Sequence, residues 1–331
     1  MTAGAQTTMK ALFQDRYGGP EVLQYGEVPL PEAREGEVLL RVKGAGIHQG
    51  DAHLMTGLPL VARLALGLRR PKEPVRGMDV AGIVERVGPG VTTLAPGDRV
   101  FGWCNAAFAE WARVPESQLV PLPDGLSFEA AATVATSGIT ALQAVRVRAK
   151  VEAGQRVLIT GAGGGVGTFA VQLARAAGAE VTGVCSASKV ELVRQLGAVE
   201  VFDYAKEDFT QTGRTWDVIL DCGGLRPVAD LRRALAPSGT LVFVGGEGGG
   251  QFFGGLERQL GAAALGPFVK QRFVSMFSLA NRPDLLELAK LISEGVVKAG
   301  VDRVFPLQDG AEAMRYLASG KVRGKIALTV A

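Results

Sequence analysis

Residues 161–167 read Gly-Ala-Gly-Gly-Gly-Val-Gly, a composition that suits phosphate binding. Glycine has no Cβ atom, so the backbone can come close to a pyrophosphate and donate N–H groups to it where a helix begins. The spacing of the dinucleotide-binding motif G-x-G-x-x-G is met with alanine in the first place, as Ala162-x-Gly164-x-x-Gly167. The predicted phosphate contacts are Gly163, Gly164, Gly165, Val166 and Gly167.

This glycine stretch lies between a predicted strand and a predicted helix. Residues 157–160 (Val-Leu-Ile-Thr) form a short apolar run typical of a buried strand, and apolar residues recur at helical spacing from 168 to 177. A strand, a glycine turn and a helix together open a dinucleotide-binding βαβ unit. A flexible loop without a ligand is the alternative, and it explains the flanking strand and helix less well.

Residues 180–184 are predicted to form the second strand of this unit, and the residues after it indicate which dinucleotide binds. An NAD site usually has an acidic residue there, about 20 residues past the glycines, that binds the ribose 2′-hydroxyl. Here residues 185–189 are Cys-Ser-Ala-Ser-Lys, with two hydroxyls and no acid. Ser186 and Lys189 can hold a 2′-phosphate, so we predict that the cofactor is NADP(H). Alternatively, Ser188 caps the helix that follows, whatever the cofactor.

The chain has 331 residues, 47% of them hydrophobic and 21% charged, which is typical of a globular protein large enough for two domains. Its net charge of +3 is too small to argue for nucleic-acid binding, and no apolar run approaches the roughly 20 residues of a membrane span. The cysteines show neither a disulfide framework nor zinc-ligand spacing, and the N-terminus has no signal-peptide pattern. We therefore expect a cytoplasmic protein that binds neither nucleic acid nor membrane.

Two patterns divide the chain. Up to about residue 125, short predicted strands alternate with glycine and proline turns, for example at 9–13, 21–25 and 38–42, which indicates a β-rich, barrel-like domain. From Ser127 to about residue 245, strands alternate with helices, which indicates a parallel, doubly wound sheet. The predicted fold class is therefore α/β.

Motifs spread over nearly the whole chain resemble those of the medium-chain dehydrogenase/reductases, in their zinc-free quinone oxidoreductase-like branch. They include Gly77-Met-Asp-Val-Ala-Gly-Ile-Val-Glu-Arg-Val-Gly88, Pro96-Gly-Asp-Arg-Val-Phe101, the glycine stretch and Gly320-Lys-Val-Arg-Gly-Lys325. The resemblance implies a GroES-like barrel domain at 1–130 and 275–331 and a Rossmann NADP(H)-binding domain at 131–274. The cofactor is then expected in the cleft between the two domains.

Zinc-dependent members of this family differ from the chain at the metal-binding positions. They have a cysteine where this chain has His48, a histidine where it has Met78, and a further cysteine that has no counterpart near Ser137. Because thioether sulfur is a poor zinc ligand and one imidazole cannot replace three ligands, we expect no bound metal. A cluster of His48, Asp51 and His53 is the alternative metal site, but it lacks the ligand spacing of known sites.

The resemblance also implies roles for individual residues. His48 and Asp51 stand where zinc-free relatives often have Asn and Asp beside the nicotinamide ribose, so both are catalytic candidates. Alternatively, Asp51 only braces its loop. The implied cofactor contacts are Thr140 beside the nicotinamide, Lys189 and Tyr204 at the 2′-phosphate, Gly245 at the nicotinamide edge of the sheet, and Lys325.

We predict an NADPH-dependent oxidoreductase that transfers hydride to quinones or to the activated C=C bond of α,β-unsaturated carbonyl compounds without zinc. The alternatives are an alcohol dehydrogenase-type oxidoreductase and a non-catalytic NADPH-binding sensor or scaffold. Relatives pair through an edge of the Rossmann sheet, so we expect a homodimer with residues 240–244 or 268–277 at the interface. Residues 60–71 fit a solvated helix at the cleft mouth better than an amphipathic helix on a membrane.

Overall fold

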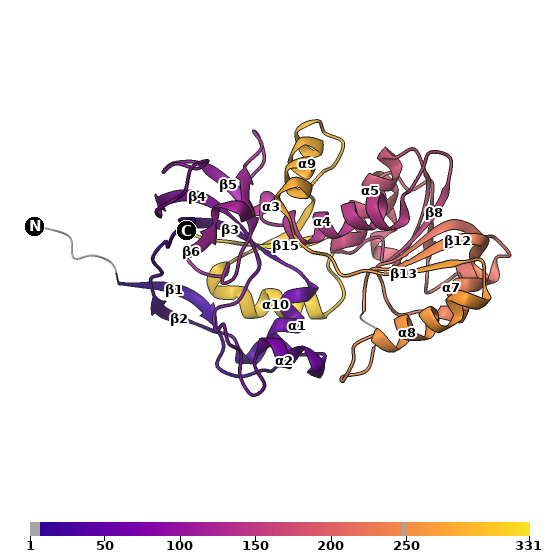
Figure 1. Cartoon of the computed structure of the whole chain (residues 1–331), viewed down its shortest axis with the longest axis horizontal. Helices are drawn as coiled ribbons and strands as arrows, with labels where there is room; N and C mark the ends of the chain where they lie inside the picture. The colour runs from indigo at the N-terminus through magenta and orange to yellow at the C-terminus, as the bar shows by residue number, and fades with distance from the viewer. Residues whose placement is uncertain (1–6, 247–248) are drawn as a thin grey trace, which may run out of the picture.

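Two β-sheets organise the chain, and Figure 1 shows them side by side along the long axis of the molecule. The computed structural model describes residues 7–246 and 249–331. The first sheet is mainly antiparallel and runs in the order β14-β15-β3-β4-β5-β7, with β6 paired to β3. Its strands are β3 (Glu37–Ile47), β4 (Asp79–Val87), β5 (Arg99–Trp103), β6 (Trp111–Pro115), β7 (Leu119–Pro121), β14 (Val301–Pro306) and β15 (Lys325–Thr329).

The first sheet confirms the β-rich domain predicted for the first part of the chain, and β14 and β15 from near the C-terminus join it. β3 is the longest strand in it and pairs with β15, β4 and β6. Its apolar residues Val38, Leu40 and Val42 are buried in one core. β1 (Thr8–Phe13) and β2 (Gln24–Pro29) form a separate antiparallel pair. The Leu12 N–H of β1 donates to the carbonyl oxygen of Phe108, in the loop between β5 and β6, at 2.8 Å.

Within the described residues, the second sheet has six parallel strands in the order β10-β9-β8-β11-β12-β13, which confirms the predicted doubly wound sheet. In β8, Val157 and Ile159 face one core and Leu158 faces another, because alternate residues of a strand point to opposite faces. Both faces must therefore be covered. The strands are β8 (Arg156–Thr160), β9 (Glu180–Cys185), β10 (Glu200–Asp203), β11 (Trp216–Asp221), β12 (Leu235–Phe243) and β13 (Arg272–Ser275).

Helices cover the two faces of this sheet. On one face lie α4 (Ala135–Leu142), which continues as a π-helical turn to Ala149, and α5 (Gly165–Ala176). On the other face α7 (Val228–Arg233) contributes Leu231 to the core, and α8 (Leu256–Leu265) contributes Ala262. The remaining helices are α1 (Gln49–Thr56), α2 (Arg63–Leu66), α3 (Phe128–Ala131), α6 (Val190–Gln195), α9 (Arg282–Ser293) and α10 (Gly310–Ala318).

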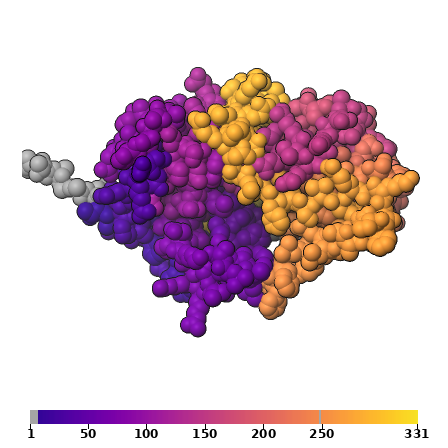
Figure 2. Space-filling view, in the orientation of Figure 1, coloured from indigo at the N-terminus to yellow at the C-terminus, as the bar shows by residue number. Residues whose placement is uncertain are grey.

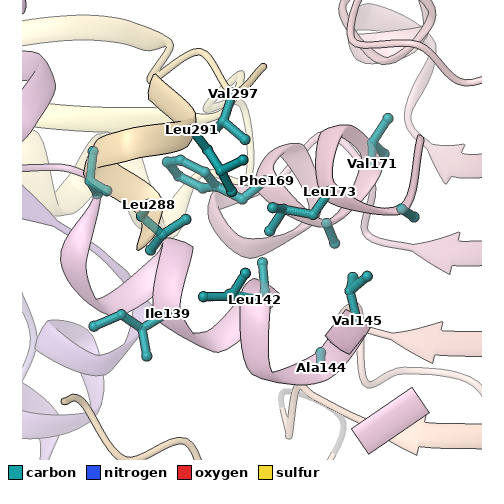
Figure 3. Packing of buried hydrophobic residues seen from close by; sticks show 14 of the residues in the cluster. Ile139, Leu142, Ala144, Val145, Phe169, Val171, Leu173, Leu288, Leu291 and Val297 are labelled. Carbon is teal, nitrogen blue, oxygen red and sulfur yellow. The ribbon is translucent and has the colours of Figure 1, made fainter. Parts of the chain in front are cut away.

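A three-helix core joins the two halves of the molecule. Figure 3 shows Ile139 and Leu142 of α4 close to Phe169 of α5 and Leu288 of α9. A Cβ at Gly138 would lie 2.9 Å from Leu288 Cδ1, so this glycine allows α9 to pack closely on α4. The same core also contains Phe101 of the first sheet. The domain limits at 130/131 and 274/275 stay a prediction.

Two local predictions are wrong, and two helices, α1 and α8, were not predicted. The strand expected at 21–25 begins only at Gln24, because Pro20–Val22 form a 3-10 turn with proline in its first position. The helix expected over 60–71 ends at Gly67, whose φ of +117° disfavours any side chain. Helix α8 follows a glycine-rich segment that gave no clear starting signal in the sequence.

We expect a homodimer that forms through β13. This strand is an edge of the second sheet, and the aromatic residues Phe268 and Phe277 near its ends are 84% and 69% exposed. Changing both residues to Glu should convert the dimer to a monomer in sedimentation velocity, because two charges per subunit would enter the interface. Val199→Glu, an exposed site before the opposite edge strand, should leave the dimer intact. A monomeric wild-type protein would contradict the prediction.

Candidate functional site

The predicted phosphate-binding loop lies at the carboxyl edge of the second sheet, between β8 and α5. Ligands of doubly wound sheets bind at this edge, where the strand order reverses; here β8 stands between β9 and β11. Gly161 has a φ of +64°, which favours glycine. A Cβ at Gly167 would lie 2.2 Å from the Gly161 carbonyl oxygen. These two glycines therefore shape the turn and let the helix start close to the strand.

The start of α5 is open to a ligand. A Cβ at Gly164 would meet the Gly161 carbonyl oxygen at 3.2 Å and no other group beyond its chain neighbours. Gly164 is the N-cap, and no side chain caps the helix. The first-turn N–H groups, those of Gly165, Val166 and Gly167, have no intrahelical acceptor. This cradle fits a pyrophosphate, which the positive end of the helix stabilises.

Ser186 and Tyr204 lie next to each other beyond the carboxyl ends of β9 and β10. The Tyr204 N–H donates to the carbonyl oxygen of Cys185, the residue before Ser186, at 3.2 Å. The Tyr204 side chain is 57% exposed and can therefore reach a ligand. The Ser186 and Ser188 hydroxyl oxygens are 3.4 Å apart. Ser188 caps no helix, so the structure does not support that alternative role.

Lys189 connects this group to the glycine loop. Its stem covers Gly163, where a Cβ would lie 2.7 Å from the Lys189 Cβ. Its Nζ donates to the Gly320 carbonyl oxygen at 2.9 Å. Partial burial lowers the pKa of Lys189, against the opposing effects of Cys185 and Asp302. The predicted 2′-phosphate residues and the predicted pyrophosphate loop are thus brought together.

His48 and Asp51 form the start of α1 in the first half of the chain. The Asp51 Oδ2 accepts a hydrogen bond from the His48 backbone N–H at 2.9 Å and lies 3.6 Å from the His48 Nδ1. Both residues are buried, and the His48 Nε2 and the Asp51 Oδ1 have no hydrogen-bond partner among the described residues. Asp51 therefore braces its loop with one oxygen, while the other is buried without a partner in the described part of the chain.

Lys325 is the link between this pair and the glycine loop. Its side chain is buried at the start of β15, and its Nζ donates to the Ser137 hydroxyl at 2.9 Å. A Cβ at Gly165 would lie 3.1 Å from the Lys325 Cδ. Asp51 and Asp79 are near enough to raise the pKa of Lys325 against the effect of burial. One ammonium group thus lies among the cofactor loop, α4 and the two carboxyls.

Burial shifts the pKa of each member of this cluster toward the neutral form. It raises the pKa of Asp51 to about 7 and that of Asp79 to about 6, and it lowers the pKa of Lys325. Burial also lowers the pKa of His48, and the charges of Lys325 and His53 lower it further. Carboxyls with a pKa near neutrality can exchange protons with a ligand, which makes the cluster a candidate for acid–base chemistry.

Asp79 was not predicted as a site residue, although it lies within one of the motifs that carry the resemblance. Its carboxyl accepts hydrogen bonds from the Thr136 N–H, at 3.1 Å to each oxygen, and from the Thr136 hydroxyl. This contact ties β4 to the start of α4. Sequence patterns gave no sign of it, because the two residues are 57 positions apart.

Thr140 and Gly245 are less directly connected to the cluster. The Thr140 hydroxyl donates to the Thr136 carbonyl oxygen at 2.7 Å within α4. Gly245 follows β12, and a Cβ there would lie 2.3 Å from the Cys222 carbonyl oxygen after β11. The structure thus places Gly245 at the carboxyl edge of the sheet and requires a glycine there for packing. Its predicted contact with nicotinamide stays a prediction.

A buried network that sequence reasoning missed holds α8 to the same edge. The Asp221 carboxylate accepts hydrogen bonds from the Thr160 hydroxyl at 2.7 Å and from the Arg258 Nη2 at 2.8 Å. The Arg258 Nη1 donates to the Gly224 carbonyl oxygen at 2.6 Å. Arg258 therefore fixes the first turn of α8 against the end of β11.

The two halves of the chain also meet through backbone hydrogen bonds. The Leu60 and Val61 N–H groups donate to the carbonyl oxygens of Gln251 and Phe252, at 2.8 and 3.2 Å. Figure 2 shows the purple and orange segments adjacent at the lower edge of the molecule. Residues 247 and 248, between Gly246 and this contact, lie outside the described residues. Residues 60 and 61 therefore lie at a contact between the two halves of the chain, and their place at a cleft mouth stays a prediction.

No described group of three or more His, Cys, Asp or Glu side chains has an arrangement that could hold a metal ion. The alternative cluster of His48, Asp51 and His53 is therefore not supported. Of the helices in the described part of the chain, none is long and apolar enough to cross a membrane.

Comparisons with known proteins agree with this architecture. Residues 34–124 match the alcohol dehydrogenase GroES-like domain, and residues 196–328 match the family described as zinc-binding dehydrogenase. A quinone oxidoreductase of Pseudomonas aeruginosa is 32% identical and aligns with 94% of this chain and 97% of its own. The trans-enoyl reductase pgmF of Aspergillus terreus is also 32% identical, covering 100% and 98%. The Escherichia coli quinone oxidoreductase complexed with NADPH superposes with a TM-score of 0.84 at 27% identity, covering 97% and 99%.

Two glycine substitutions should separate ligand binding from folding. In Gly164→Val, the new side chain meets little protein but fills the pyrophosphate cradle, so NADPH binding by fluorescence titration should be lost while circular dichroism stays unchanged. In Gly167→Val, the side chain would collide with the Gly161 carbonyl oxygen and should destabilise the fold. If Gly164→Val still binds NADPH with wild-type affinity, the cofactor does not bind here.

The raised pKa of Asp51 predicts the pH dependence of stability. The carboxyl has a pKa near 3.8 when unfolded and about 7 when folded, so its contribution is fully present below pH 4 and is lost as pH rises through 7. Asp51→Asn cannot ionise and should therefore gain stability over wild type between pH 5 and pH 8, by on the order of 1–3 kcal/mol in urea unfolding. Asp124→Asn, at an exposed carboxyl, is the control. If Asp51→Asn differs from wild type in stability by the same amount at pH 5 and at pH 8, the raised pKa of Asp51 is contradicted.

Proposed function

Because this chain belongs to the medium-chain dehydrogenase/reductases, in their quinone oxidoreductase-like branch, we propose that it is an NADPH-dependent reductase of quinones or of the activated C=C bond of α,β-unsaturated carbonyl compounds. The observation that carries the proposal is the position of Lys325. Its stem lies against Gly165 of the loop, and its charge acts on Asp51 and His48. Lys325 therefore lies between the dinucleotide-binding loop and the titratable pair of His48 and Asp51.

The residues present fit NADPH. When bound, this cofactor supplies the hydride. The first-turn N–H groups of α5 bind its pyrophosphate, and Ser186, Lys189 and Tyr204 bind its 2′-phosphate. Thr140, Gly245 and Lys325 border the nicotinamide half. The NADPH complex of the Escherichia coli relative supports this choice of cofactor.

His48 orients the substrate through a hydrogen bond, and Asp51 exchanges a proton with the substrate or with water. A lowered pKa keeps the His48 imidazole neutral, so a tautomer protonated at Nε2 can donate a hydrogen bond to the substrate carbonyl oxygen. That bond strengthens as negative charge develops on the oxygen. Asp51, with a pKa of about 7, holds the start of α1 and can exchange a proton with the substrate or with water.

Zinc-independent reduction fits the donor atoms better than alcohol oxidation does. At the positions where zinc-dependent relatives bind metal, this chain offers one imidazole, one thioether and one hydroxyl, from His48, Met78 and Ser137. The Ser137 hydroxyl already accepts a hydrogen bond from Lys325. An alcohol dehydrogenase would lack its usual means of stabilising an alkoxide here. The three cysteines, all free, fit a reaction in a reducing cytosol.

NADPH oxidation with a panel of quinones, enones and alcohols tests the proposed activity. We expect turnover with quinones or enones at neutral pH, unchanged by a chelator, in protein that contains less than stoichiometric zinc. Zinc-dependent oxidation of alcohols would favour the alcohol dehydrogenase alternative. Tight NADPH binding without turnover of any acceptor would favour a sensor or scaffold.

Lys189→Ala should weaken NADPH binding and leave NADH binding nearly unchanged. A lost charge-assisted contact to phosphate costs about 1.5–3 kcal/mol, or roughly a 10- to 150-fold rise in the NADPH dissociation constant. Lys189→Met keeps a stem over Gly163 and separates the loss of charge from the loss of packing. Titration of both variants with both cofactors measures the effect. Equal weakening of NADPH and NADH would contradict the assignment of the 2′-phosphate site.

A further inference from the structure

A cavity lies in the first half of the chain, between α1, α2 and the residues before β4. It has a volume of about 210 Å³, and its walls include Leu54 of α1, Leu66 of α2 and Met78. Met78 connects it to His48, because a Cβ at Gly50 would lie 2.8 Å from the His48 Cε1 and 3.8 Å from the Met78 Sδ. The cavity is smaller than the roughly 300–1,000 Å³ of usual ligand pockets. A compact occupant is therefore required.

Three charged residues line this cavity, Lys72, Glu73 and Arg76, and of these only Arg76 is buried. Arg76 is only 6% exposed. Its backbone is fixed by hydrogen bonds to Leu12 and Phe108, and its Nε donates to the Pro74 carbonyl oxygen at 3.3 Å. Within the described part of the chain, its Nη atoms have no hydrogen-bond partner and no carboxylate lies within ion-pair distance. Four N–H donors thus remain unused.

Among the other polar groups around the cavity, the exposed Glu73 favours the charged form of Arg76 but makes no ion pair with it within the described residues. The Tyr17 hydroxyl donates to the Gly67 carbonyl oxygen at 2.8 Å, and the Arg63 guanidinium stacks on the Tyr17 ring. Asp51 is close enough to influence Arg76, but burial raises the pKa of its carboxyl to about 7, so near pH 6 it is mostly neutral. The Arg76 Nη atoms are not among the buried nitrogens that lack a partner, so they reach the open space of the cavity, where a ligand anion can pair with them.

We propose that this cavity binds the acceptor substrate and that Arg76 selects one class of it: small, apolar enones that carry a carboxylate. A guanidinium holds a carboxylate through two parallel hydrogen bonds, and the apolar walls accept the rest of the molecule. The inference rests on the proposed reductase function for its chemistry. The hydride then comes from NADPH and adds to the β-carbon, while a proton adds to the α-carbon.

A matched pair of substrates tests the selection by Arg76. 3-Benzoylacrylate carries the carboxylate, and its methyl ester has the same enone without the charge. At pH 6, wild-type kcat/KM should favour the acid at least tenfold. In Arg76→Met this preference should fall by about 10- to 100-fold, mainly through a higher KM for the acid, with the ester little changed. Arg69→Met, at an exposed arginine that does not line the cavity, should keep the wild-type preference.

Calorimetry with 3-benzoylpropionate separates this inference from the proposed reaction, because that acid has no C=C bond to reduce. It should bind wild type and Arg69→Met, and Arg76→Met should lose binding at least tenfold; Arg76→Lys, which keeps the charge, should retain part of it. Arg76-dependent binding without turnover of any acceptor would uphold the cavity and reject the reductase. Turnover of enones with the same acid-to-ester ratio in wild type and Arg76→Met would uphold the reductase and overturn the role of Arg76.

Discussion

The arrangement of the site depends on one buried ammonium group. The Lys325 side chain is almost fully inaccessible, which would be strongly unfavourable for an isolated charge. The Ser137 hydroxyl and the nearby carboxyls of Asp51 and Asp79 make its burial tolerable. These partners come from α4, α1 and β4, so the same amine gathers three segments far apart in the sequence. Because its stem also lies against Gly165, the cofactor cradle and the catalytic pair share a single fixed point.

The contact between the first sheet and the residues around α4 depends on close approach of their backbones as well as on charge. A Cβ at Gly46 of β3 would lie 2.1 Å from the Ala132 carbonyl oxygen, and one at Gly44 would lie 2.6 Å from that of Phe128. The first sheet can therefore pack directly on α3 and the residues before α4. On the other side of α4, Gly138 admits α9. The position of Ser137 relative to Lys325 thus follows from small residues on both faces of one segment.

The sequence predicts those parts of the site that depend on local patterns. The glycine spacing, the strand before it and the helix after it located the cradle, and the missing acid after β9 pointed to Ser186 and Lys189. Interactions between distant segments left no such pattern. Asp79 meets Thr136 and Arg258 meets Asp221 only after the chain has folded. Arg76 looks like an ordinary polar residue in the sequence, and only its burial beside a cavity marks it.

The pKa shifts of the buried cluster connect the charge of a bound ligand to the protonation of the titratable side chains. Burial raises the pKa of Asp51 and Asp79 and lowers that of Lys325, so it favours the neutral form of all three groups. An anion bound at the start of α5 acts first on Lys325, whose stem touches that loop, and favours its charged form. A charged Lys325 in turn favours ionised carboxyls and disfavours a protonated His48. Phosphate bound at the start of α5 would thus change the protonation of Asp51, Asp79 and His48.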